Sequence, residues 1–346
     1  MAKQDLPNQQ PPATEQIFQL CIGYMASISL NVVTKLSIAE QLARSPMDVE
    51  DLARVAGVNA DALYRVMRAL STVGVFHEVA RRRFEQTPLS DLLRADHPQS
   101  LRSFVLFFPD PLHFRSYANL MHSVKTGQPT GMPTFGQELF EYYRDHPEES
   151  AVFNAAMMNM TATFIPAVLA AYDFSETRVL VDVGGGHGSV VGAILQKYPQ
   201  MRGILFDVDH VVQGAEPHLR AMGVADRCEI VAGDFFKSVT RGGDTYIMKN
   251  IIHDWDDERS LRILKNIGDQ LKKNQPRGRV ILLEMILTSG NEPQLGKWAD
   301  IEMLALAGGR ERTEDEYREL FAKAGFRLAH ITPTQSPQSV IEAVPM

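Results

Sequence analysis

Cysteine is nearly absent from this chain, which has only Cys21 and Cys228 among its 346 residues. The two thiols lie far apart and follow no metal-ligand spacing, so a disulfide framework is not expected. Two free thiols in so long a chain are typical of a reducing compartment, and we expect a cytoplasmic protein. No cluster of histidine, cysteine and acidic residues has the spacing of a metal site either, so we expect no metal.

The chain has no long apolar run and no excess of basic residues, and we expect no leader sequence. Residues 1–16 are polar and rich in proline and glutamine, which is unlike a signal peptide. No run reaches the roughly 20 apolar residues that span a bilayer. The formal net charge of -7 disfavours a nucleic-acid partner, because phosphates attract a basic surface. We therefore expect neither a membrane nor a nucleic-acid partner.

The N-terminal third of the chain is predicted to be helical, with one β-hairpin. Residues 14–43 form an unusually apolar helical pattern, which requires burial from more than one side, by the rest of the chain or by a second subunit. Residues 46–95 have the helix, helix and hairpin order of a winged helix, in which Asn59 caps a helix that Gly74 closes. Arginines near the expected wing could contact DNA, but the acidic chain and the neighbouring glutamates favour a scaffold for packing or dimerisation.

Residues 97–172 are predicted to be mostly helical, with breaks at proline and glycine. They include an aromatic cluster that has two interpretations. The cluster could line a pocket for an aromatic substrate, because ligand pockets are mostly apolar, or it could be ordinary core or interface packing. Its members are Phe104, Phe107, Phe108, Phe114 and Tyr117.

Strands and helices alternate from Arg178 onward, a pattern typical of a mostly parallel sheet with helices on both faces. The fold class is therefore α/β, with a Rossmann-like, seven-stranded sheet. We expect its strands at 179–183, 203–207, 228–232, 245–249, 279–287, 327–331 and 339–344. We expect its helices at 188–198, 211–222, 257–272, 296–307 and 313–325.

Ligand-binding features stand at the ends of the first expected strands of this sheet. The glycine-rich turn at 184–188 lets a ligand approach the main chain. Ser189 occupies the place of the third glycine of the dinucleotide fingerprint, which disfavours a nicotinamide dehydrogenase. Asp207 ends the next strand, where an acid hydrogen-bonds ribose hydroxyls. Asp234 and Phe235 follow the third strand, where a carboxylate and a ring can bind adenine, so a cofactor that contains adenosine is predicted.

Several segments, such as Val-Asp-Val-Gly-Gly-Gly-His-Gly, resemble the S-adenosylmethionine-dependent O-methyltransferases of the caffeate and hydroxyindole type. The matching segments are 181–188, 206–211, 233–236, 248–255 and 308–313, and the resemblance covers roughly the whole chain. It implies a class I methyltransferase sheet and S-adenosylmethionine as the cofactor. The implied cofactor-binding residues are Gly184, Gly186, Asp207, Asp234, Phe235 and Lys249.

Sequence pattern and resemblance together suggest how the chain is divided. A disordered tail at 1–13 precedes an all-α, winged-helix-like dimerisation domain at 14–110. A helical linker with substrate-lining helices at 111–172 leads into a catalytic domain at 173–346, which binds the cofactor. We therefore expect a homodimer that is joined through the N-terminal helices.

A general base is needed if a hydroxyl accepts the methyl group, because the proton of that hydroxyl must be removed. His253 follows the strand at 245–249 and could act as the base, although a single histidine at such a place is often structural. Glu284 lies inside an apolar strand and needs a partner, since an unpaired buried carboxylate is costly, and Glu311 follows a Gly-Gly turn. The resemblance implies that His253 is the base and that the two glutamates orient it, as a carboxylate orients the histidine of a catalytic triad.

The residues expected around the substrate have structural alternatives. The resemblance implies that Asp254 lies near the methyl acceptor and Trp255 near the adenine, but Asp254 could instead cap the next helix and Trp255 could be core. Further candidates for the walls of the substrate pocket are Met157, Trp298 and Met303. Met157 could equally fill a gap in the core, as methionine often does.

The sequence therefore predicts an enzyme that transfers a methyl group in line from S-adenosylmethionine to a hydroxyl of a small aromatic or polyketide-like metabolite. Two other functions stay open. The chain could be a cofactor-binding relative that catalyses decarboxylation or hydroxylation, or a winged-helix regulator that binds DNA. The intact set of His253, Glu284 and Glu311 argues against the first alternative, and the acidic net charge argues against the second.

Overall fold

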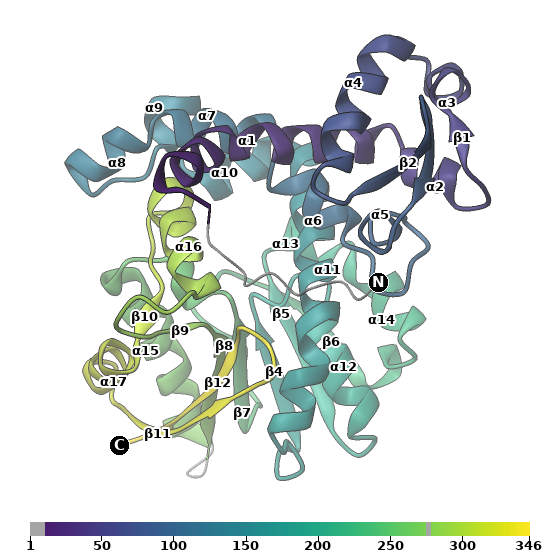
Figure 1. The fold of residues 1–346 in the computed structure, drawn as a ribbon. Coiled ribbons are helices and arrows are strands. Elements are labelled where there is room, and N and C mark those ends of the chain that lie inside the picture. Colours follow the sequence, from purple (N-terminus) through teal and green to yellow (C-terminus); the bar gives the residue numbers. More distant parts are fainter. Residues whose placement is uncertain (1–10, 275–277) are drawn as a thin grey trace, which may run out of the picture. The chain divides into compact units, whose positions relative to one another are not determined.

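The computed structural model describes residues 11–274 and 278–346, and the chain divides into two compact units, Met1–Asp110 and Pro111–Met346 (Figure 1). Most of the tail expected at 1–13 lies outside the described residues, and the first helix, α1, begins at Ala13. The first unit has a hydrophobic core of its own, and the second has a core on each face of its large sheet.

The first unit is mainly helical and carries one small sheet. Its elements are α1 (Ala13–Lys35), α2 (Ile38–Leu42), β1 (Met47–Asp48), α3 (Val49–Ala56), α4 (Ala60–Ser71), β2 (Phe76–Ala80), β3 (Arg83–Gln86), α5 (Pro88–Asp91) and α6 (Arg102–Phe107). Asn59 caps α4 as predicted, because its side chain accepts a hydrogen bond from the amide of Ala62 at 2.9 Å. The predicted hairpin of β2 and β3 is present, but β1 pairs with β3 as well, so the unit is not all-α.

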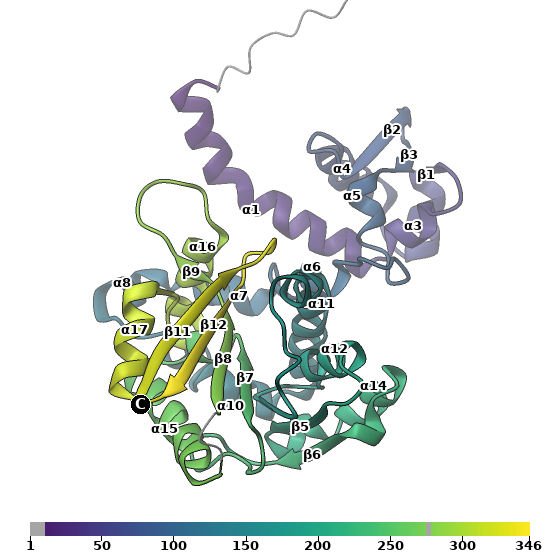
Figure 2. The same ribbon diagram turned by 90° about the horizontal axis from the view of Figure 1, so that it is seen from below.

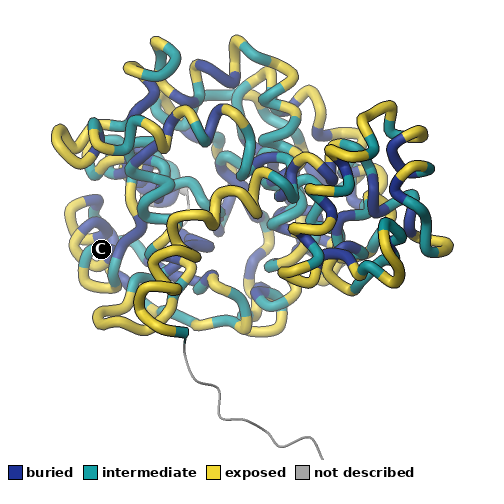
Figure 3. The backbone as a smooth tube through the Cα atoms, turned by 45° about the horizontal axis from the view of Figure 1, so that its top comes forward, coloured by how far each residue is buried: buried dark blue, intermediate teal, exposed yellow. Residues whose placement is uncertain are grey.

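Helix α1 leaves a row of large apolar side chains exposed in the single chain. Leu20 is 74% exposed and Phe18 is 69% exposed. Figure 3 shows most of α1, next to the N-terminal end, as an exposed segment. Val33, near the end of the helix, is the part that reaches the core of the first unit. The first unit therefore leaves the apolar surface of α1 uncovered, which fits a second subunit, one of the two alternatives that the sequence left open.

Two helices, α1 and α11 (Pro147–Ala171), are long and apolar enough to cross a membrane by length and composition alone. The expectation that no segment of the chain passes such a test was therefore too strict. The core helix of a soluble protein passes it equally well, and α11 packs through Ile165 and Val168 against the large sheet. Both helices fit a soluble protein.

The second unit begins with the helices that were expected up to residue 172. They are α7 (Pro111–Ala118), α8 (Leu120–Thr126), α9 (Gly131–Phe135), α10 (Leu139–Asp145) and the long α11. The predicted aromatic cluster is divided between the two units. Phe104 and Phe108 pack together in the first unit with ring centroids 4.4 Å apart, while Tyr117 hydrogen-bonds Glu302 in the second. Both interpretations of the cluster stay open.

The second unit is built on a seven-stranded sheet with the order β11-β12-β8-β7-β4-β5-β6. Its strands are β4 (Val179–Val183), β5 (Arg202–Asp207), β6 (Cys228–Ala232), β7 (Thr245–Lys249), β8 (Arg279–Glu284), β11 (Phe326–Pro333) and β12 (Ser339–Pro345). Neighbours from β8 to β6 are parallel, and β12 and β11 are antiparallel additions at one edge. The prediction of a mostly parallel α/β sheet is confirmed.

Helices cover both faces of this sheet. One core lies under α15 (Asp257–Asn274) and α17 (Glu314–Lys323), and the other under α11, α12 (Ser189–Lys197) and α14 (Ala215–Ala221). Figure 2 shows these helical layers on opposite sides of the sheet. Successive residues of a strand point to opposite faces, so in β8 Leu282 enters the first core and Leu283 the second. The apolar, buried strands position their polar carboxyl ends for the site.

The strand expected at 279–287 is divided, and the division shapes the site. Strand β8 ends at Glu284, after which the chain leaves the sheet and forms β9 (Ile286–Leu287). This short strand pairs in parallel with β10 (Arg312–Thr313), far along the chain. The partner of the strand therefore changes after Glu284, which is why one expected strand became two.

Two expected helices are also divided. The helix expected at 211–222 is α13 (Asp209–Val212) followed by α14. The helix expected at 296–307 is α16 (Leu295–Glu302) followed by a π-helical turn, η3 (Met303–Ala307). In η3 the carbonyl of Ala305 accepts hydrogen bonds from the amide and the hydroxyl of Thr130, at 2.8 and 2.9 Å. An outside donor to a helix carbonyl interrupts the regular ladder.

Candidate active site

The predicted site residues gather at the carboxyl edge of the parallel strands. The chain runs from β4 outward through β5 to β6 and then returns to the other side of β4 as β7. Ligands of open α/β sheets bind at such a reversal of strand order. The loops that follow β4 and β7 meet here, because a Cβ on Gly184 would lie 2.6 Å from Cδ1 of Ile251.

The glycine turn after β4 combines tight packing with one open position. Gly184, Gly186 and Gly188 have φ values of 69°, 61° and 85°, which glycine adopts without steric cost. A Cβ on Gly188 would lie 2.9 Å from Leu219, whereas a Cβ on Gly186 would meet nothing within 4 Å. The backbone at Gly186 therefore faces open space, where a ligand can approach it.

Asp207, at the end of β5, supports this turn. Its Oδ2 accepts a hydrogen bond from the amide of Gly186 at 2.8 Å, and its Oδ1 accepts one from the amide of Val208 at 2.7 Å. Burial raises the pKa of Asp207, and the two amide bonds oppose that rise. Each oxygen keeps a second lone pair, so the carboxylate can fix the turn and still accept from a ribose hydroxyl.

Asp234 and Phe235 follow β6 on the same edge. The Asp234 side chain is 37% exposed, and its Oδ1 accepts a hydrogen bond from the amide of Phe236 at 2.9 Å. The ring of Phe235 packs edge-on against Phe236 with centroids 4.8 Å apart and lies 3.5 Å from a Cβ built on Gly184. The structure thus brings these predicted adenine contacts to the glycine turn.

Lys249 ends β7, next to the strand that carries the glycine turn. Burial lowers the pKa of its ammonium group, and the nearby Glu284, Asp182 and Asp254 oppose that effect. The half-buried lysine therefore belongs to the same group of charged residues as the predicted base.

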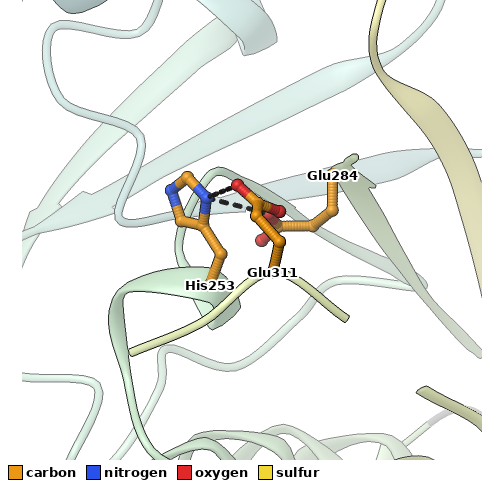
Figure 4. A group of neighbouring side chains, drawn as sticks. All are labelled: His253, Glu284 and Glu311. Atoms are coloured by element: carbon orange, nitrogen blue, oxygen red, sulfur yellow. Dashed lines mark hydrogen bonds and ion pairs between the residues drawn. The ribbon is translucent and has the colours of Figure 1, made fainter. Parts of the chain in front are cut away.

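His253 lies in a short helical turn, η2 (Ile252–Asp254), shortly after β7. Its side chain is 9% exposed. Nδ1 forms a hydrogen bond of 2.7 Å with Oε1 of Glu311 and lies 3.7 Å from Oε2 of Glu284 (Figure 4). Nε2 lies 3.5 Å from Oδ1 of Asp254. The structure therefore brings the predicted base and both predicted glutamates together.

The two glutamates hold the histidine in different ways. Glu284 is completely buried at the end of β8. Its Oε1 accepts hydrogen bonds from the amides of Ile251 and Ile252, at 3.1 and 3.0 Å. Glu284 thereby fixes the backbone of the turn, whereas Glu311 contacts the imidazole ring of His253 directly.

Residues 308–312 run against the His253 turn. A Cβ on Gly309 would overlap the carbonyl oxygen of His253, so a glycine is required there. The amide of Arg310 donates to that carbonyl at 2.8 Å, and the amide of Glu311 donates to Oδ1 of Asp300 at 3.0 Å. The pairing of β9 with β10 brings this segment to the end of β8, which explains how Glu311 reaches the ring of His253.

The charges around His253 make it strongly basic. Burial alone would lower its pKa, but the carboxylates of Glu284, Glu311 and Asp254 outweigh burial and raise it to about 10. Burial raises the pKa of Glu284 to about 7 and that of Asp254 to about 6, against the opposing effect of His253. A tyrosine phenol has an unperturbed pKa of about 10, so this imidazole can accept a proton from a phenol once it has lost its own.

His253, Glu284 and Glu311 also have the composition of a metal site. One ligand atom from each lies within 4.8 Å of the others. Nδ1 of His253 is already engaged by Glu311, however, and Glu284 is engaged by two backbone amides. These bonds account for the cluster without an ion, so the expectation of no metal stays a prediction.

Asp254 does not cap the following helix. That role belongs to Asp256, whose Oδ1 accepts a hydrogen bond from the amide of Arg259 at 2.8 Å. Asp254 instead points its carboxylate at Nε2 of His253. Trp255 is 8% exposed and packs among the rings of Phe140, Phe235 and Phe236. It is therefore a core residue that also lies beside the predicted adenine contact.

The remaining predicted substrate residues lie on helices of the second unit. Met157 is on α11, Trp298 is on α16, and Met303 begins η3. Trp298 is 73% exposed, and the two methionines are half-buried. The π-helical turn η3 contacts the His253 turn and the helices α7 to α10. The contact of these three side chains with a substrate stays a prediction.

Sequence reasoning missed two buried charged residues. Asp182 is 1% exposed and accepts a hydrogen bond from the amide of Val191 at 3.1 Å, which ties β4 to α12. Arg312 is also 1% exposed, and it binds the carbonyls of Ile252 and Trp255, each at 3.0 Å. An acid inside an apolar strand was a signal for Asp182, as it was for the buried glutamate of β8. The sequence around Arg312, which follows Glu311, gave no comparable signal that the arginine would be buried.

Comparison with known proteins decides the family. Residues 117–327 match the O-methyltransferase domain, and residues 18–96 match the O-methyltransferase dimerisation domain. The chain belongs to the O-methyltransferase family. The predicted order of a helical dimerisation domain and a methyltransferase sheet is thereby confirmed.

Relatives within the O-methyltransferase family cover nearly the whole chain. The chain is 41% identical to the phenazine O-methyltransferase PhzM of Lysobacter antibioticus over 97% of each chain. It is 30% identical to the phenazine-1-carboxylate N-methyltransferase of Pseudomonas aeruginosa, over 94% of this chain and 95% of the relative. The solved structure of LaPhzM has a TM-score of 0.93 and 41% identity, and the match covers 97% of this chain and 100% of LaPhzM.

Solved members of the O-methyltransferase family hold the predicted cofactor. NcsB1, from neocarzinostatin biosynthesis, was solved with S-adenosylmethionine and 2-hydroxy-5-methyl naphthoic acid. It is 27% identical, with a TM-score of 0.80, over 93% of this chain and 96% of NcsB1. S-adenosylmethionine is the cofactor of the family, as the sequence predicted. These comparisons support neither a DNA-binding regulator nor a decarboxylating or hydroxylating relative.

Proposed function

We propose that this methyltransferase transfers the methyl group of S-adenosylmethionine to a hydroxyl of a small, planar aromatic metabolite. The relatives described above are named for phenazines, and NcsB1 was solved with a naphthoic acid. Both kinds of molecule are fused aromatic rings, which supports an acceptor of that class. The choice between oxygen and nitrogen as the acceptor atom is argued from His253, because family members act on either.

The buried hydrogen bond of 2.7 Å between His253 and Glu311 is the observation that favours oxygen over nitrogen as the methyl acceptor. A hydroxyl must lose its proton as it is methylated, and a held imidazole provides the base. With Nδ1 engaged by Glu311, Nε2 is the atom that accepts the proton, as in a catalytic triad. An amine attacks with its free lone pair and depends less on such a base.

The residues at the carboxyl edge fit S-adenosylmethionine. Gly186 presents open backbone, and Asp207 has lone pairs for ribose hydroxyls. Asp234 and Phe235 would bind the adenine, and Lys249 lies near the acidic residues of the site. When bound, the cofactor supplies an electrophilic methyl group on a sulfonium.

The proton transfer falls to this chain's own residues. His253 takes the hydroxyl proton at Nε2, and the charges of Glu311 and Glu284 stabilise the imidazolium that forms. Asp254, 3.5 Å from Nε2, adds a third stabilising charge on the side where the proton arrives. General bases work best when their pKa lies near the operating pH, so the raised pKa of His253 makes its base form available only as the pH rises toward that value.

The test uses labelled S-adenosylmethionine with a panel of hydroxylated fused-ring aromatics and the matching amines. We expect transfer to a hydroxyl, with a product mass that rises by one methylene unit. The variant His253→Gln should lose two to four powers of ten in kcat, while its Kd for S-adenosylmethionine stays within about twofold. The control is His330→Gln, an exposed histidine on the edge strand β11, which should keep wild-type kinetics.

Two results would contradict this proposal. One is methylation of amines only, with no transfer to any hydroxyl on the panel. The other is an accepted hydroxyl substrate on which His253→Gln keeps the wild-type kcat.

The proposal includes a homodimer formed through the N-terminal unit, in the cytoplasm. The match of residues 18–96 to a dimerisation domain and the exposed apolar row of α1 support the dimer. Two free cysteines support a reducing compartment. In sedimentation at micromolar concentration, a species of 38.6 kDa alone would contradict the dimer.

A further inference from the structure

Arg312 is a buried charge that the proposed reaction does not use directly. Its side chain is 1% exposed, and it is among the largest fully buried side chains of the described residues. Burying a guanidinium is costly unless its donors are satisfied. The residue follows Glu311 in the sequence and begins β10, so its position is set by the segment that also delivers that glutamate.

The partners of Arg312 lie on both sides of His253. Nη1 donates to the carbonyl of Ile252 at 3.0 Å, and Nη2 donates to the carbonyl of Trp255 at 3.0 Å. The two carbonyls bracket the dipeptide of His253 and Asp254. A planar guanidinium can hold both carbonyls at once, which the single ammonium group of a lysine cannot do in the same geometry.

The guanidinium is anchored from behind by the start of α15. Nη2 and Nε lie 2.9 and 3.3 Å from Oδ1 of Asp257, and Nη2 lies 3.4 Å from the hydroxyl of Ser260. Asp257 has a second partner in Arg310, at 2.8 Å, and Asp256 caps the helix independently. The start of α15 therefore does not depend on Arg312 alone.

The His253 turn, by contrast, has few other restraints on its carbonyls. The other hydrogen bonds to the Ile252 and Trp255 carbonyls are long, at 3.3 Å. Glu284 holds the amides at the start of the turn, and the amide of Arg310 holds the carbonyl of His253. Arg312 supplies the shortest bonds to the carbonyls of Ile252 and Trp255.

We propose that Arg312 is a positioning residue for methyl transfer, which holds the backbone of the His253 turn so that the imidazole meets Glu311 and presents Nε2 to the acceptor. The inference rests on the proposed function of His253 as the base. Without Arg312 the turn relaxes, and the 2.7 Å hydrogen bond to Glu311 lengthens. A displacement of about 1 Å at a reacting group costs roughly a hundredfold in rate.

The first test compares Arg312→Lys with the wild type on an accepted substrate. Arg312→Lys keeps the positive charge but loses the planar guanidinium that binds both carbonyls, and we expect its kcat to fall about a hundredfold. Its KM and Kd for S-adenosylmethionine should stay within about twofold, because the cofactor residues lie on other strands. Arg310→Lys is the matched comparison, because the Arg310 side chain also binds Asp257 but donates no hydrogen bond to the His253 turn. The decrease in kcat of Arg310→Lys should be at least tenfold smaller than that of Arg312→Lys. Arg318→Lys, on the exposed face of α17, should behave as the wild type.

The second test does not depend on activity. In the wild type, NMR titration of the His253 ring should give a pKa well above its ordinary value, because the carboxylates hold its proton. In Arg312→Lys the inflection should move down toward 6.5 as the ring moves away from Glu311. Arg312→Ala serves as a second variant, and added guanidinium ion should restore part of its kcat.

The outcomes separate this inference from the proposed function. A wild-type enzyme that methylates no hydroxyl overturns the proposed function, while the NMR titration still tests the position of His253. A wild-type kcat together with an unshifted titration in Arg312→Lys overturns the inference. A parallel loss of kcat and cofactor affinity in that variant also overturns it, because Arg312 would then support the whole domain rather than the turn.

Discussion

Glu284 and Glu311 have the same side chain but different tasks at His253. Glu284 accepts hydrogen bonds from two backbone amides and so holds the backbone of the His253 turn, while Glu311 forms a hydrogen bond with the imidazole ring. The carboxylates nevertheless act together on the proton, because both raise the pKa of the histidine. Substitution by glutamine separates these tasks, since an amide oxygen still accepts from a backbone amide but carries no charge.

The pH dependence of the reaction should report the charge on Glu311. In the wild type, kcat/KM for a phenol should rise with pH toward the raised pKa of His253, because the free enzyme must lose that proton before it can accept another. Glu311→Gln removes a charge that raises this pKa, so the inflection should move to lower pH.

This prediction is checked by measuring kcat/KM from about pH 6 to about pH 10. Glu314→Gln, an exposed glutamate nearby on α17, is the control and should keep the wild-type profile. An inflection that stays in place in Glu311→Gln would show that Glu311 does not set the basicity of the histidine.

At the scale of secondary-structure elements, strand ends were the predictable part of the site. Apolar strands and their glycine or acidic ends are local signals, so the places of Gly184, Asp207 and Asp234 could be predicted from the sequence. The contact of Ile286 with Arg312 could not, because a two-residue ladder between distant segments has no local pattern. That ladder brings Glu311 to His253, and only family resemblance pointed to the pair.

Local choices between neighbouring residues were also beyond the sequence. Asp254 and Asp256 are both plausible caps for α15, and the actual cap is Asp256. What separates them is the short turn η2, which directs Asp254 toward His253. The direction of a single turn depends on tertiary contacts such as the two amide bonds to Glu284.

The close approach of 308–312 to the His253 turn predicts the effect of a small substitution. A methyl group at Gly309 would overlap the His253 carbonyl, so Gly309→Ala must displace either the turn or the segment that carries Glu311. We expect kcat to fall about a hundredfold. The Kd for S-adenosylmethionine, measured by calorimetry, should change little and serves as the internal control. Equal losses in kcat and cofactor affinity would contradict a displacement confined to the base.

At the scale of the whole molecule, the second unit buries several acidic groups whose charged forms are disfavoured. Burial raises the pKa of Asp182 to about 7, and it also raises the pKa of Glu284, to about 7, and that of Asp254, to about 6. A carboxyl group with a raised pKa in the folded state stabilises the fold fully only below its unfolded pKa, and that stability is lost as pH rises through the folded value. Without ligand, these groups make the fold less stable as they ionise.

Asp182→Asn should reveal this dependence. The amide oxygen of asparagine can still accept from the Val191 amide, but it carries no charge to bury. The melting temperature of the variant relative to the wild type should therefore rise with pH, between about pH 4 and about pH 7, by a few degrees. Thermal denaturation of both proteins across this range measures the difference. A constant or falling difference would show that the Asp182 charge is not costly in the fold.

The strand order also has a consequence for how such enzymes diversify. Apart from Lys249, the residues proposed to meet the methyl donor lie before residue 237, and those proposed to handle the proton lie after residue 248. A single recombination point between β6 and β7 would therefore exchange the acid–base half between two relatives and leave the donor half intact except for Lys249. Donor recognition and proton handling would then be inherited largely as separate segments of the chain, although the loops after β4 and β7 meet in the folded protein.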